Sequence, residues 1–234
     1  MSERLEGRVA VVTGGGRGIG RAIALRLAEH GAFVAVTART AEEIDAVADE
    51  IRSVGGRALS IPADVTHPGE LEELERAVEA ALGPTEILVN NAGIVARVPL
   101  QQMREETWDA VLDTNLKGAF LCSRQFLPAM MRRLRGRIIN VSSISGRLGT
   151  AQLTAYCASK WGLVGLTKAL AEEVRDQGIQ VNAIAPGSVA TEMLERGMPG
   201  AEADLTPDDV AKVALFLAAD APDGMTGSVL DVWG

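Results

Sequence analysis

The sequence predicts an α/β fold, a doubly wound parallel sheet of about seven strands with helices on both faces. Short apolar runs alternate with longer amphipathic segments along the whole chain, which is typical of repeated βα units. A glycine-rich turn joins the first apolar run to the first amphipathic segment. The chain has 234 residues, 47% of them hydrophobic, which is enough for one large core.

The elements follow one another without a linker, an internal repeat or a low-complexity tract. The first helix should end at Gly31, since glycine is a good C-terminal cap. The strands are expected at residues 8–13, 33–37, 57–62, 87–90, 137–142, 179–185 and 228–232, and the helices at residues 18–30, 41–54, 68–82, 104–133, 156–177 and 207–219. We therefore expect residues 1–234 to form a single domain.

The glycine-rich turn after the first strand reads G-G-G-R-G-I-G, with Gly14, Gly18 and Gly20 spaced as G-x-x-x-G-x-G. Glycines at such a turn let backbone N–H groups approach a pyrophosphate at the positive end of the following helix. A glycine turn alone can be a simple connector, but the βαβ context favours a Rossmann-type site that binds NAD(P).

Tyr156 is the only tyrosine, and it lies four residues before Lys160 and thirteen after Ser143. On a helix, this spacing places the lysine ammonium beside the phenol. A cation about 5 Å away favours the phenolate by ~3 kcal/mol at an effective dielectric of roughly 20, or about two pKa units. A proton donor tuned in this way suits acid catalysis on a carbonyl. The alternative is an ordinary pair on an amphipathic helix.

Several motifs occur in one order along the chain: T-G-G-G-R-G-I-G from Thr13, N-N-A-G from Asn90, Asn115, Ser143, Y-C-A-S-K from Tyr156, and P-G-S-V-A-T from Pro186. Together they resemble the short-chain dehydrogenases/reductases over essentially the whole chain. The chain looks most similar to the 3-oxoacyl-[acyl-carrier-protein] reductase branch, which reduces a β-keto thioester with NADPH.

The resemblance implies a catalytic set of Asn115, Ser143, Tyr156 and Lys160. Tyr156 would give its proton to the substrate carbonyl oxygen while Ser143, favoured over its neighbour Ser142, hydrogen-bonds that oxygen. Lys160 would lower the pKa of the tyrosine and bind ribose hydroxyls, and Asn115 would hold a water that joins Lys160 to a proton relay. A buried asparagine that satisfies helix backbone is the alternative interpretation of Asn115.

The resemblance also implies where the cofactor binds. Asp64 and Val65 would flank the adenine, the N-N-A-G loop would line the adenosine side, and Val189 and Thr191 would meet the carboxamide and phosphate region. The expected cofactor-binding residues are Gly14, Gly16, Arg17, Gly18, Ile19, Gly20, Arg39, Asp64, Val65, Asn91, Ala92, Gly93, Tyr156, Lys160, Pro186, Gly187, Val189 and Thr191.

The end of the second strand predicts the cofactor preference. NAD enzymes usually place a carboxylate there, whereas NADP requires a cation for the 2′-phosphate. Here the strand ends in Ala38 followed by Arg39, and Arg17 in the glycine turn can approach the same phosphate. Two charged contacts at roughly 1.5 kcal/mol each would favour NADP(H) over NAD(H) by about 10²-fold. Both arginines could instead be ordinary surface charge.

Composition argues against nucleic-acid binding, a disulfide framework, a metal site and insertion into a membrane. A net charge of −8 argues against non-specific nucleic-acid binding. Cys122 and Cys157 have no C-x-x-C spacing and only two histidines occur, so neither a disulfide framework nor a metal site is expected. No apolar run approaches the length of a membrane span, and the first residues lack a signal-peptide core, so we expect a cytoplasmic protein that does not enter a membrane.

The predicted function is therefore NADPH-dependent interconversion of a ketone and a secondary alcohol, with a small-molecule or carrier-bound carbonyl substrate, most simply a 3-oxoacyl thioester. The alternatives are reduction of another ketone or of a sugar or polyol substrate, or a non-catalytic NADP-binding protein.

The segment 188–205 is shorter than the family's usual substrate lid, and we expect it to be mobile with an open pocket. Helices 104–133 and 156–177 suit a subunit interface, in a homodimer or homotetramer. Four arginines that close the first of these, Arg132, Arg133, Arg135 and Arg137, are expected at a solvated helix end, with an acidic carrier protein as the alternative partner.

Overall fold

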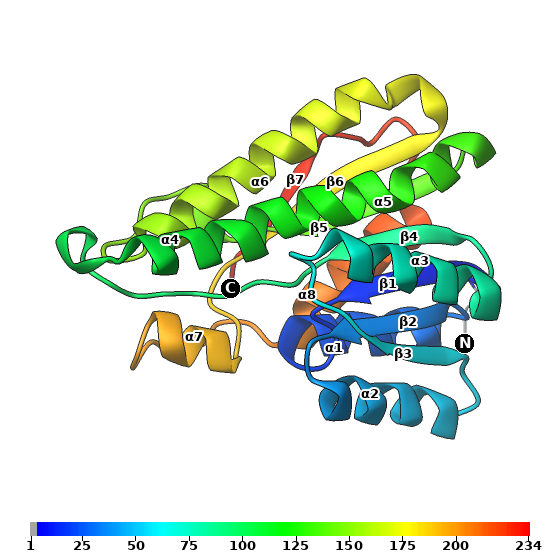
Figure 1. The fold of residues 1–234 in the computed structure, drawn as a ribbon, viewed down its shortest axis with the longest axis horizontal. Coiled ribbons are helices and arrows are strands. Elements are labelled where there is room, and N and C mark those ends of the chain that lie inside the picture. The colour runs from blue at the N-terminus through cyan, green and yellow to red at the C-terminus, as the bar shows by residue number, and fades with distance from the viewer. Residues whose placement is uncertain (1–3) are drawn as a thin grey trace.

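A computed structural model describes residues 4–234 and contains one parallel sheet of seven strands in the order β3-β2-β1-β4-β5-β6-β7 (Figure 1). All neighbouring strands run parallel. The strands are β1 (Val9–Thr13), β2 (Phe33–Ala38), β3 (Ala58–Pro62), β4 (Thr85–Asn90), β5 (Gly136–Val141), β6 (Ile179–Pro186) and β7 (Val229–Val232). The chain winds outward in both directions from β1, so the predicted doubly wound fold is confirmed.

Alternate residues of each central strand point into two separate cores, one on each face of the sheet. In β1, Ala10 and Val12 join the first core, while Val9 and Val11 join the second. The first core is covered by α1 (Gly18–Glu29), α2 (Ala41–Ser53) and α8 (Pro207–Leu215), and the second by α3 (Pro68–Leu82), α5 (Gly118–Arg133) and α6 (Thr154–Glu173). Burial on both faces explains why the strands are continuously apolar rather than alternating.

The long helix expected at residues 104–133 consists of three parts. These are α4 (Glu105–Leu112), a π-helical turn (Asp113–Lys117) and α5. Such π turns within helices often occur at functional sites, and this one carries Asn115. Similarly, the helix expected at 156–177 is α6 followed by a 3-10 turn (Arg175–Gln177).

The segment 188–205, which is expected to be mobile, contains a short helix, α7 (Glu192–Gly197). The Thr191 side chain accepts a hydrogen bond from the Leu194 N–H at 3.3 Å and so caps the first turn of α7. Backbone hydrogen bonds also join Ser188 and Ala190 to Leu205, so the two ends of the segment are tied together. The sequence signal for α7 is weak because it spans only six residues.

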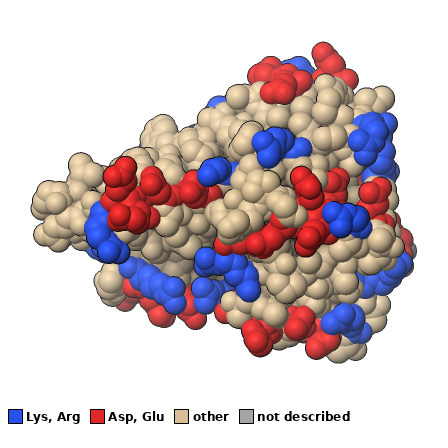
Figure 2. All heavy atoms as spheres, in the orientation of Figure 1, with Lys and Arg blue, Asp and Glu red and all other residues tan. Residues whose placement is uncertain are grey.

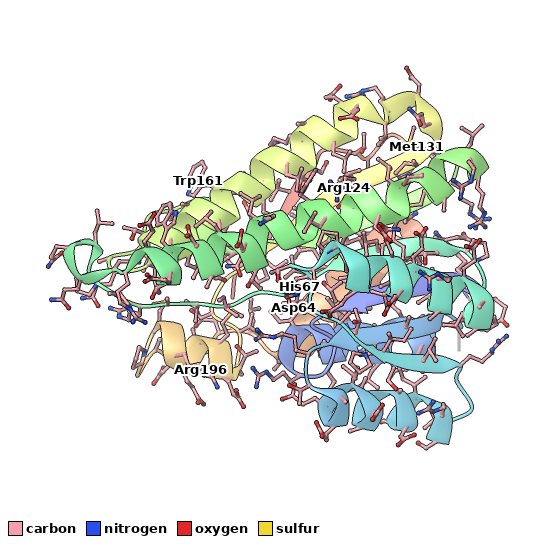
Figure 3. All side chains as sticks on the ribbon, viewed as in Figure 1. Asp64, His67, Arg124, Met131, Trp161 and Arg196 are labelled. Carbon is pink, nitrogen blue, oxygen red and sulfur yellow. The ribbon has the colours of Figure 1, made fainter. Side chains whose placement is uncertain are left out.

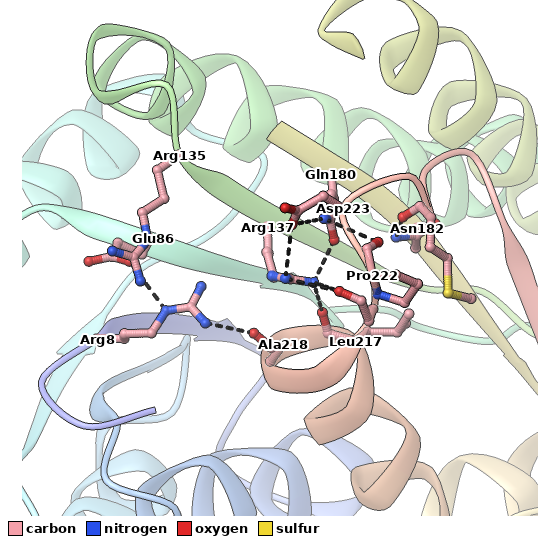
Figure 4. A network of polar contacts seen from close by, with 12 residues as sticks. Arg8, Glu86, Arg135, Arg137, Gln180, Asn182, Leu217, Ala218, Pro222 and Asp223 are labelled. Atoms are coloured by element: carbon pink, nitrogen blue, oxygen red, sulfur yellow. Dashed lines mark hydrogen bonds and ion pairs between the residues drawn. The ribbon is translucent and has the colours of Figure 1, made fainter. Parts of the chain in front are cut away.

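Glu86, at the amino end of β4, forms ion pairs with three arginines at the end of the sheet opposite the glycine turn. Figure 4 shows two of them, Arg8 and Arg135. Its carboxylate lies 3.2 Å from Arg8 Nε, 3.0 Å from Arg133 Nη2 and 2.9 Å from Arg135 Nε. The Glu86 side chain is only 10% exposed. These contacts connect the residue before β1, the start of β4, the end of α5 and the turn that follows it.

Arg137 belongs to β5 and lies beside this group (Figure 4). Its guanidinium donates to the carbonyl oxygens of Leu217 and Ala221, and its side chain is 13% exposed. Burial lowers the pKa of Arg137. The expectation of a solvated helix end is therefore wrong for Arg137, because this arginine lies in β5 and satisfies carbonyl groups of the segment after α8.

We expect Glu86→Gln to lower the free energy of unfolding by about 2 kcal/mol. The variant leaves three guanidinium groups without their shared carboxylate, and removing one partner of a buried pair is costly. The expected loss is smaller than for a fully buried ion pair because the Arg133 and Arg135 side chains are 34% and 59% exposed, so solvent screens their charges. Urea denaturation at pH 7 measures the free energy of unfolding. Glu172→Gln is the control, because it breaks an exposed ion pair with Arg175. Equal stability of both variants would contradict this account.

On the face seen in Figure 2, acidic and basic side chains are interspersed over the helices, with acidic groups gathered along its middle. Within residues 4–234, no helix combines the length and the apolar character needed to cross a membrane.

Candidate active site

A cleft of about 600 Å³ opens at the carboxyl ends of the central strands. It begins at the glycine turn after β1 and reaches Tyr156 on α6. Most of the expected site residues line this cleft: Gly14, Gly16, Arg17, Gly18, Ile19, Arg39, Asp64, Val65, Asn91, Ala92, Gly93, Tyr156, Lys160 and Thr191. The other expected residues do not line it: Gly20, Asn115, Ser143, Pro186, Gly187 and Val189.

The glycine turn packs closely against neighbouring backbone. A Cβ on Gly14 would lie 2.9 Å from Ala92 Cα, and one on Gly20 would overlap the Gly14 carbonyl oxygen. Gly18 has a φ of +53°, and its Cβ would lie 3.3 Å from Thr191 across the cleft. No side chain caps the first turn of α1, so its N–H groups are available at the turn. These features fit a dinucleotide pyrophosphate.

Thr13 and Asn91 hold the glycine turn against the loop after β4. Thr13 Oγ1 accepts hydrogen bonds from the N–H groups of Asn91 and Ala92, both at 3.1 Å. The Asn91 side chain donates to the carbonyl oxygens of Thr13 and Gly14, both at 3.0 Å. Asn91 thus shapes one wall of the cleft through the backbone.

Tyr156 and Lys160 lie one turn apart on α6, with Lys160 Nζ 5.6 Å from the centre of the phenol ring. Both side chains are buried, and Lys160 Nζ donates to the Val141 carbonyl oxygen at 2.8 Å. The Tyr156 hydroxyl contacts Met193 Sδ at 3.9 Å. Two residues that the sequence did not single out, Val141 and Met193, therefore complete the surroundings of this pair.

The direction of the pKa shift at Tyr156 is opposite to the one predicted from the sequence. Burial raises the pKa of Tyr156 to about 12, although the neighbouring Ser143 hydroxyl acts to lower it. Burial also lowers the pKa of Lys160 to about 8. The prediction treated Lys160 as a fixed cation in a half-solvated setting, but the fold removes both groups from water, and desolvation disfavours both charged forms.

Ser142 and Ser143 have different environments. The Ser142 hydroxyl donates to the Lys160 carbonyl oxygen at 3.1 Å and so attaches β5 to α6. Ser143 Oγ accepts from the Ser145 N–H at 3.1 Å and lies beside the Tyr156 phenol. Ser142 lines the cleft, whereas Ser143 is the serine beside the phenol, so the preference for Ser143 over Ser142 stays a prediction.

Asn115 is buried behind the cleft wall. Its Oδ1 accepts from the Ile94 N–H at 2.7 Å, and its Nδ2 donates to the Ile94 carbonyl and to Ser159 Oγ. A Cβ on Gly93 would lie 3.3 Å from Asn115 Oδ1 and 3.7 Å from Lys160 Nζ. Asn115 therefore fixes the loop after β4 close to the lysine.

The two arginines expected at the 2′-phosphate both contact carboxylates. Arg17 Nη1 lies 3.4 Å from Glu43 and 3.0 Å from Glu192. Arg39 Nη1 lies 3.9 Å from Asp64, and its side chain is 69% exposed. Glu43 and Glu192 line the cleft but were not expected there, because in sequence they look like ordinary charges on exposed helix surfaces.

The last expected residues support the cleft from the side. Pro186 ends β6, and Gly187 packs beside Val232 and Trp233 near the chain's end. Val189 is buried and forms a bridge with Leu205. Among residues 4–234, no three His, Cys, Asp or Glu side chains are grouped so that they could hold a metal ion.

Residues 8–200 match the family model described as short chain dehydrogenase. The 3-oxoacyl-[acyl-carrier-protein] reductase FabG of Staphylococcus epidermidis is 40% identical over 236 residues, covering 96% of this chain and 97% of the relative. A crystal structure of a putative gluconate dehydrogenase from Agrobacterium tumefaciens has a TM-score of 0.93 at 34% identity, covering 99% of this chain and 97% of the other. A putative NAD(P)-dependent gluconate 5-dehydrogenase from Beutenbergia cavernae with bound NADP has a TM-score of 0.91 at 39% identity, covering 99% and 97%.

Proposed function

This chain belongs to the short-chain dehydrogenase family, and from that membership we propose that it uses NADPH to reduce the ketone of a 3-oxoacyl thioester. The observation that carries the proposal is the buried phenol of Tyr156 at the cleft, with Ser143 beside it and Lys160 one turn along α6. The family is one of NAD(P)-dependent oxidoreductases acting on CH–OH groups. Asn115, Ser143, Tyr156 and Lys160 are our proposed catalytic set.

The proposed reaction needs one proton at the carbonyl oxygen, and Tyr156 provides it. A bound nicotinamide would supply the hydride. Because the pKa of Tyr156 is raised to about 12, the phenol holds its proton near neutral pH. Ser143 positions the carbonyl oxygen, and Lys160, with a pKa of about 8, is largely protonated at pH 7 and stabilises the phenolate as it forms. Asn115 keeps the loop after β4 in place behind them.

The wall beside Tyr156 favours an acyl substrate over a polyol. Buried Val111, Leu153 and Ala155 pack behind Tyr156, and of the partly buried apolar residues around them Ile94, Val95 and Met193 line the cleft. A polyhydroxylated acid needs several hydrogen-bond partners, and a site that lacks them discriminates against it. Since two structural relatives are described as gluconate dehydrogenases, a sugar-acid substrate is the second candidate.

NADP(H) is the proposed cofactor because β2 ends in Ala38 without a carboxylate and both Arg17 and Arg39 line the cleft. Each arginine must leave a carboxylate partner to bind a phosphate, so we propose a preference of about tenfold over NAD(H) rather than the 10²-fold predicted from the sequence. A cytoplasmic homo-oligomer acting on free or carrier-bound thioesters is part of the same proposal.

The test compares two thioester substrates that differ by four methylene groups, the N-acetylcysteamine thioesters of acetoacetate and 3-oxooctanoate, with 5-ketogluconate. Apolar burial of about 0.8 kcal/mol per methylene sets an upper limit near 10²-fold. With partial burial we expect kcat/KM to be roughly tenfold higher for the longer thioester, and higher for either thioester than for the sugar acid. Absorbance of NADPH and of NADH measures both rates. Faster reduction of 5-ketogluconate would favour the second candidate.

A further inference from the structure

Arg17 is shared by two carboxylates that come from separate parts of the fold. Glu43 lies in the first turn of α2, and Glu192 is the first residue of α7. The same Glu192 oxygen that lies 3.0 Å from Arg17 also lies 3.2 Å from Arg196 Nη2, one turn further along α7. Figure 3 labels Arg196 on this helix. Arg17 therefore joins the glycine turn, α2 and α7 through side-chain charge alone.

All four of these side chains line the cleft near the end of β2. A Cβ on Gly16 would lie 2.7 Å from Glu43 Cβ and 3.1 Å from Glu43 Oε2, so this carboxylate is held directly against the glycine turn. An anion that approaches Arg17 from the cleft must displace Glu43, Glu192 or both, or accept their repulsion.

We propose that Glu43 and Glu192 are specificity-determining residues, which compete with the phosphate monoester on the adenosine ribose of the cofactor for the Arg17 guanidinium. The inference rests on the proposed use of NADP(H). The competition lowers the gain from a 2′-phosphate without affecting a nucleotide that carries only a hydroxyl there. The Glu192 contact extends the competition to α7.

The exposure of the three side chains determines the size of the effect. Arg17 is 55% exposed, Glu43 35% and Glu192 57%, so each ion pair is weak. A phosphate dianion forms a stronger, charge-assisted pair with a guanidinium and can displace them. One exposed pair corresponds to an affinity change of roughly two- to fivefold, so the carboxylates moderate cofactor preference but do not reverse it.

Displacement of Glu192 has a consequence at the other end of the cleft. The next residue, Met193, contacts the Tyr156 hydroxyl through its sulfur atom. The carboxyl end of α7 is held separately, since Arg97 donates to the Gly197 carbonyl oxygen at 3.0 Å and Gly197 packs on Val95. Loss of the Glu192 pair therefore loosens mainly the first turn of α7, which is the part beside the phenol.

The test measures binding of adenosine 2′,5′-bisphosphate and of adenosine 5′-monophosphate to the full chain by calorimetry. These probes differ only in the 2′-phosphate. We expect Glu43→Gln and Glu192→Gln each to tighten the bisphosphate about threefold, and the double variant about tenfold, with the monophosphate changed less than twofold. Glu42→Gln and Glu195→Gln are matched controls, since both are exposed, lie on the same helices and do not line the cleft.

Hydrogen exchange of residues 192–197 gives a second readout that does not depend on activity. We expect the bisphosphate, but not the monophosphate, to speed exchange there about two- to threefold in the natural sequence and to have no further effect in Glu192→Gln. The inference is overturned if the variants and their controls bind the bisphosphate equally, or if the monophosphate tightens in parallel. Failure of the unaltered chain to bind either nucleotide would instead contradict the proposed function.

Discussion

We expect Tyr156→Phe to lower kcat by roughly 10²–10⁴-fold with little change in cofactor affinity. The substitution removes one oxygen atom and keeps the ring that packs against Val111, Leu153 and Ala155. The Tyr156 hydroxyl contacts Met193 Sδ at 3.9 Å and the neighbouring Ser143, so the substitution removes only these two polar contacts. Steady-state kinetics with a 3-oxoacyl thioester and a separate titration of NADPH fluorescence measure the two quantities.

Trp161→Phe is the matched control, because Trp161 is an exposed aromatic residue on the same helix (Figure 3). It should leave kcat within about twofold, as most surface substitutions have small effects. Turnover of Tyr156→Phe close to that of the unaltered protein would exclude the phenol as the proton donor. A large loss of NADPH binding in that variant would show that the ring hydroxyl serves the cofactor instead.

Much of the fold could be predicted because strands buried on both faces leave a continuous apolar signal. The prediction of β4 began at Ile87 and missed Thr85 and Glu86. A glutamate at the start of a buried strand contradicts the pattern unless its charge is paired, and the partners Arg8, Arg133 and Arg135 come from distant parts of the sequence. Such compensation is visible only in three dimensions.

The site was predictable where its chemistry depends on local spacing. The glycine turn and the separation of Tyr156 from Lys160 are properties of short segments. The direction of the Tyr156 pKa shift was not predictable, because it depends on burial among residues from separate segments, such as Val111 and Met193. The contacts of Arg17 with Glu43 and Glu192 were also not predictable, since nothing in the sequence distinguishes these carboxylates from solvated ones.

Lys160 gives the second large effect, a dependence of stability on pH. Its pKa is lowered from 10.5 to about 8 because burial disfavours the ammonium form. Between these values the unfolded chain holds a proton that the folded chain has released, so stability rises with pH. The gain is ~1.4 kcal/mol per pH unit, or about 3 kcal/mol from pH 8 to pH 10. Lys160→Met lacks this contribution.

Urea denaturation of the unaltered protein and of Lys160→Met, measured from pH 7.5 to pH 10, should therefore give stabilities whose difference shifts by about 3 kcal/mol in favour of the unaltered protein as pH rises. The raised pKa of Cys122, about 12, lowers stability above pH 9, but it acts in both proteins and cancels in the difference. Lys168→Met, at an exposed position of the same helix, should run parallel to the unaltered protein. Parallel curves for Lys160→Met as well would mean that the Lys160 ammonium keeps its proton inside the fold, with Val141 as sufficient compensation for the loss of water.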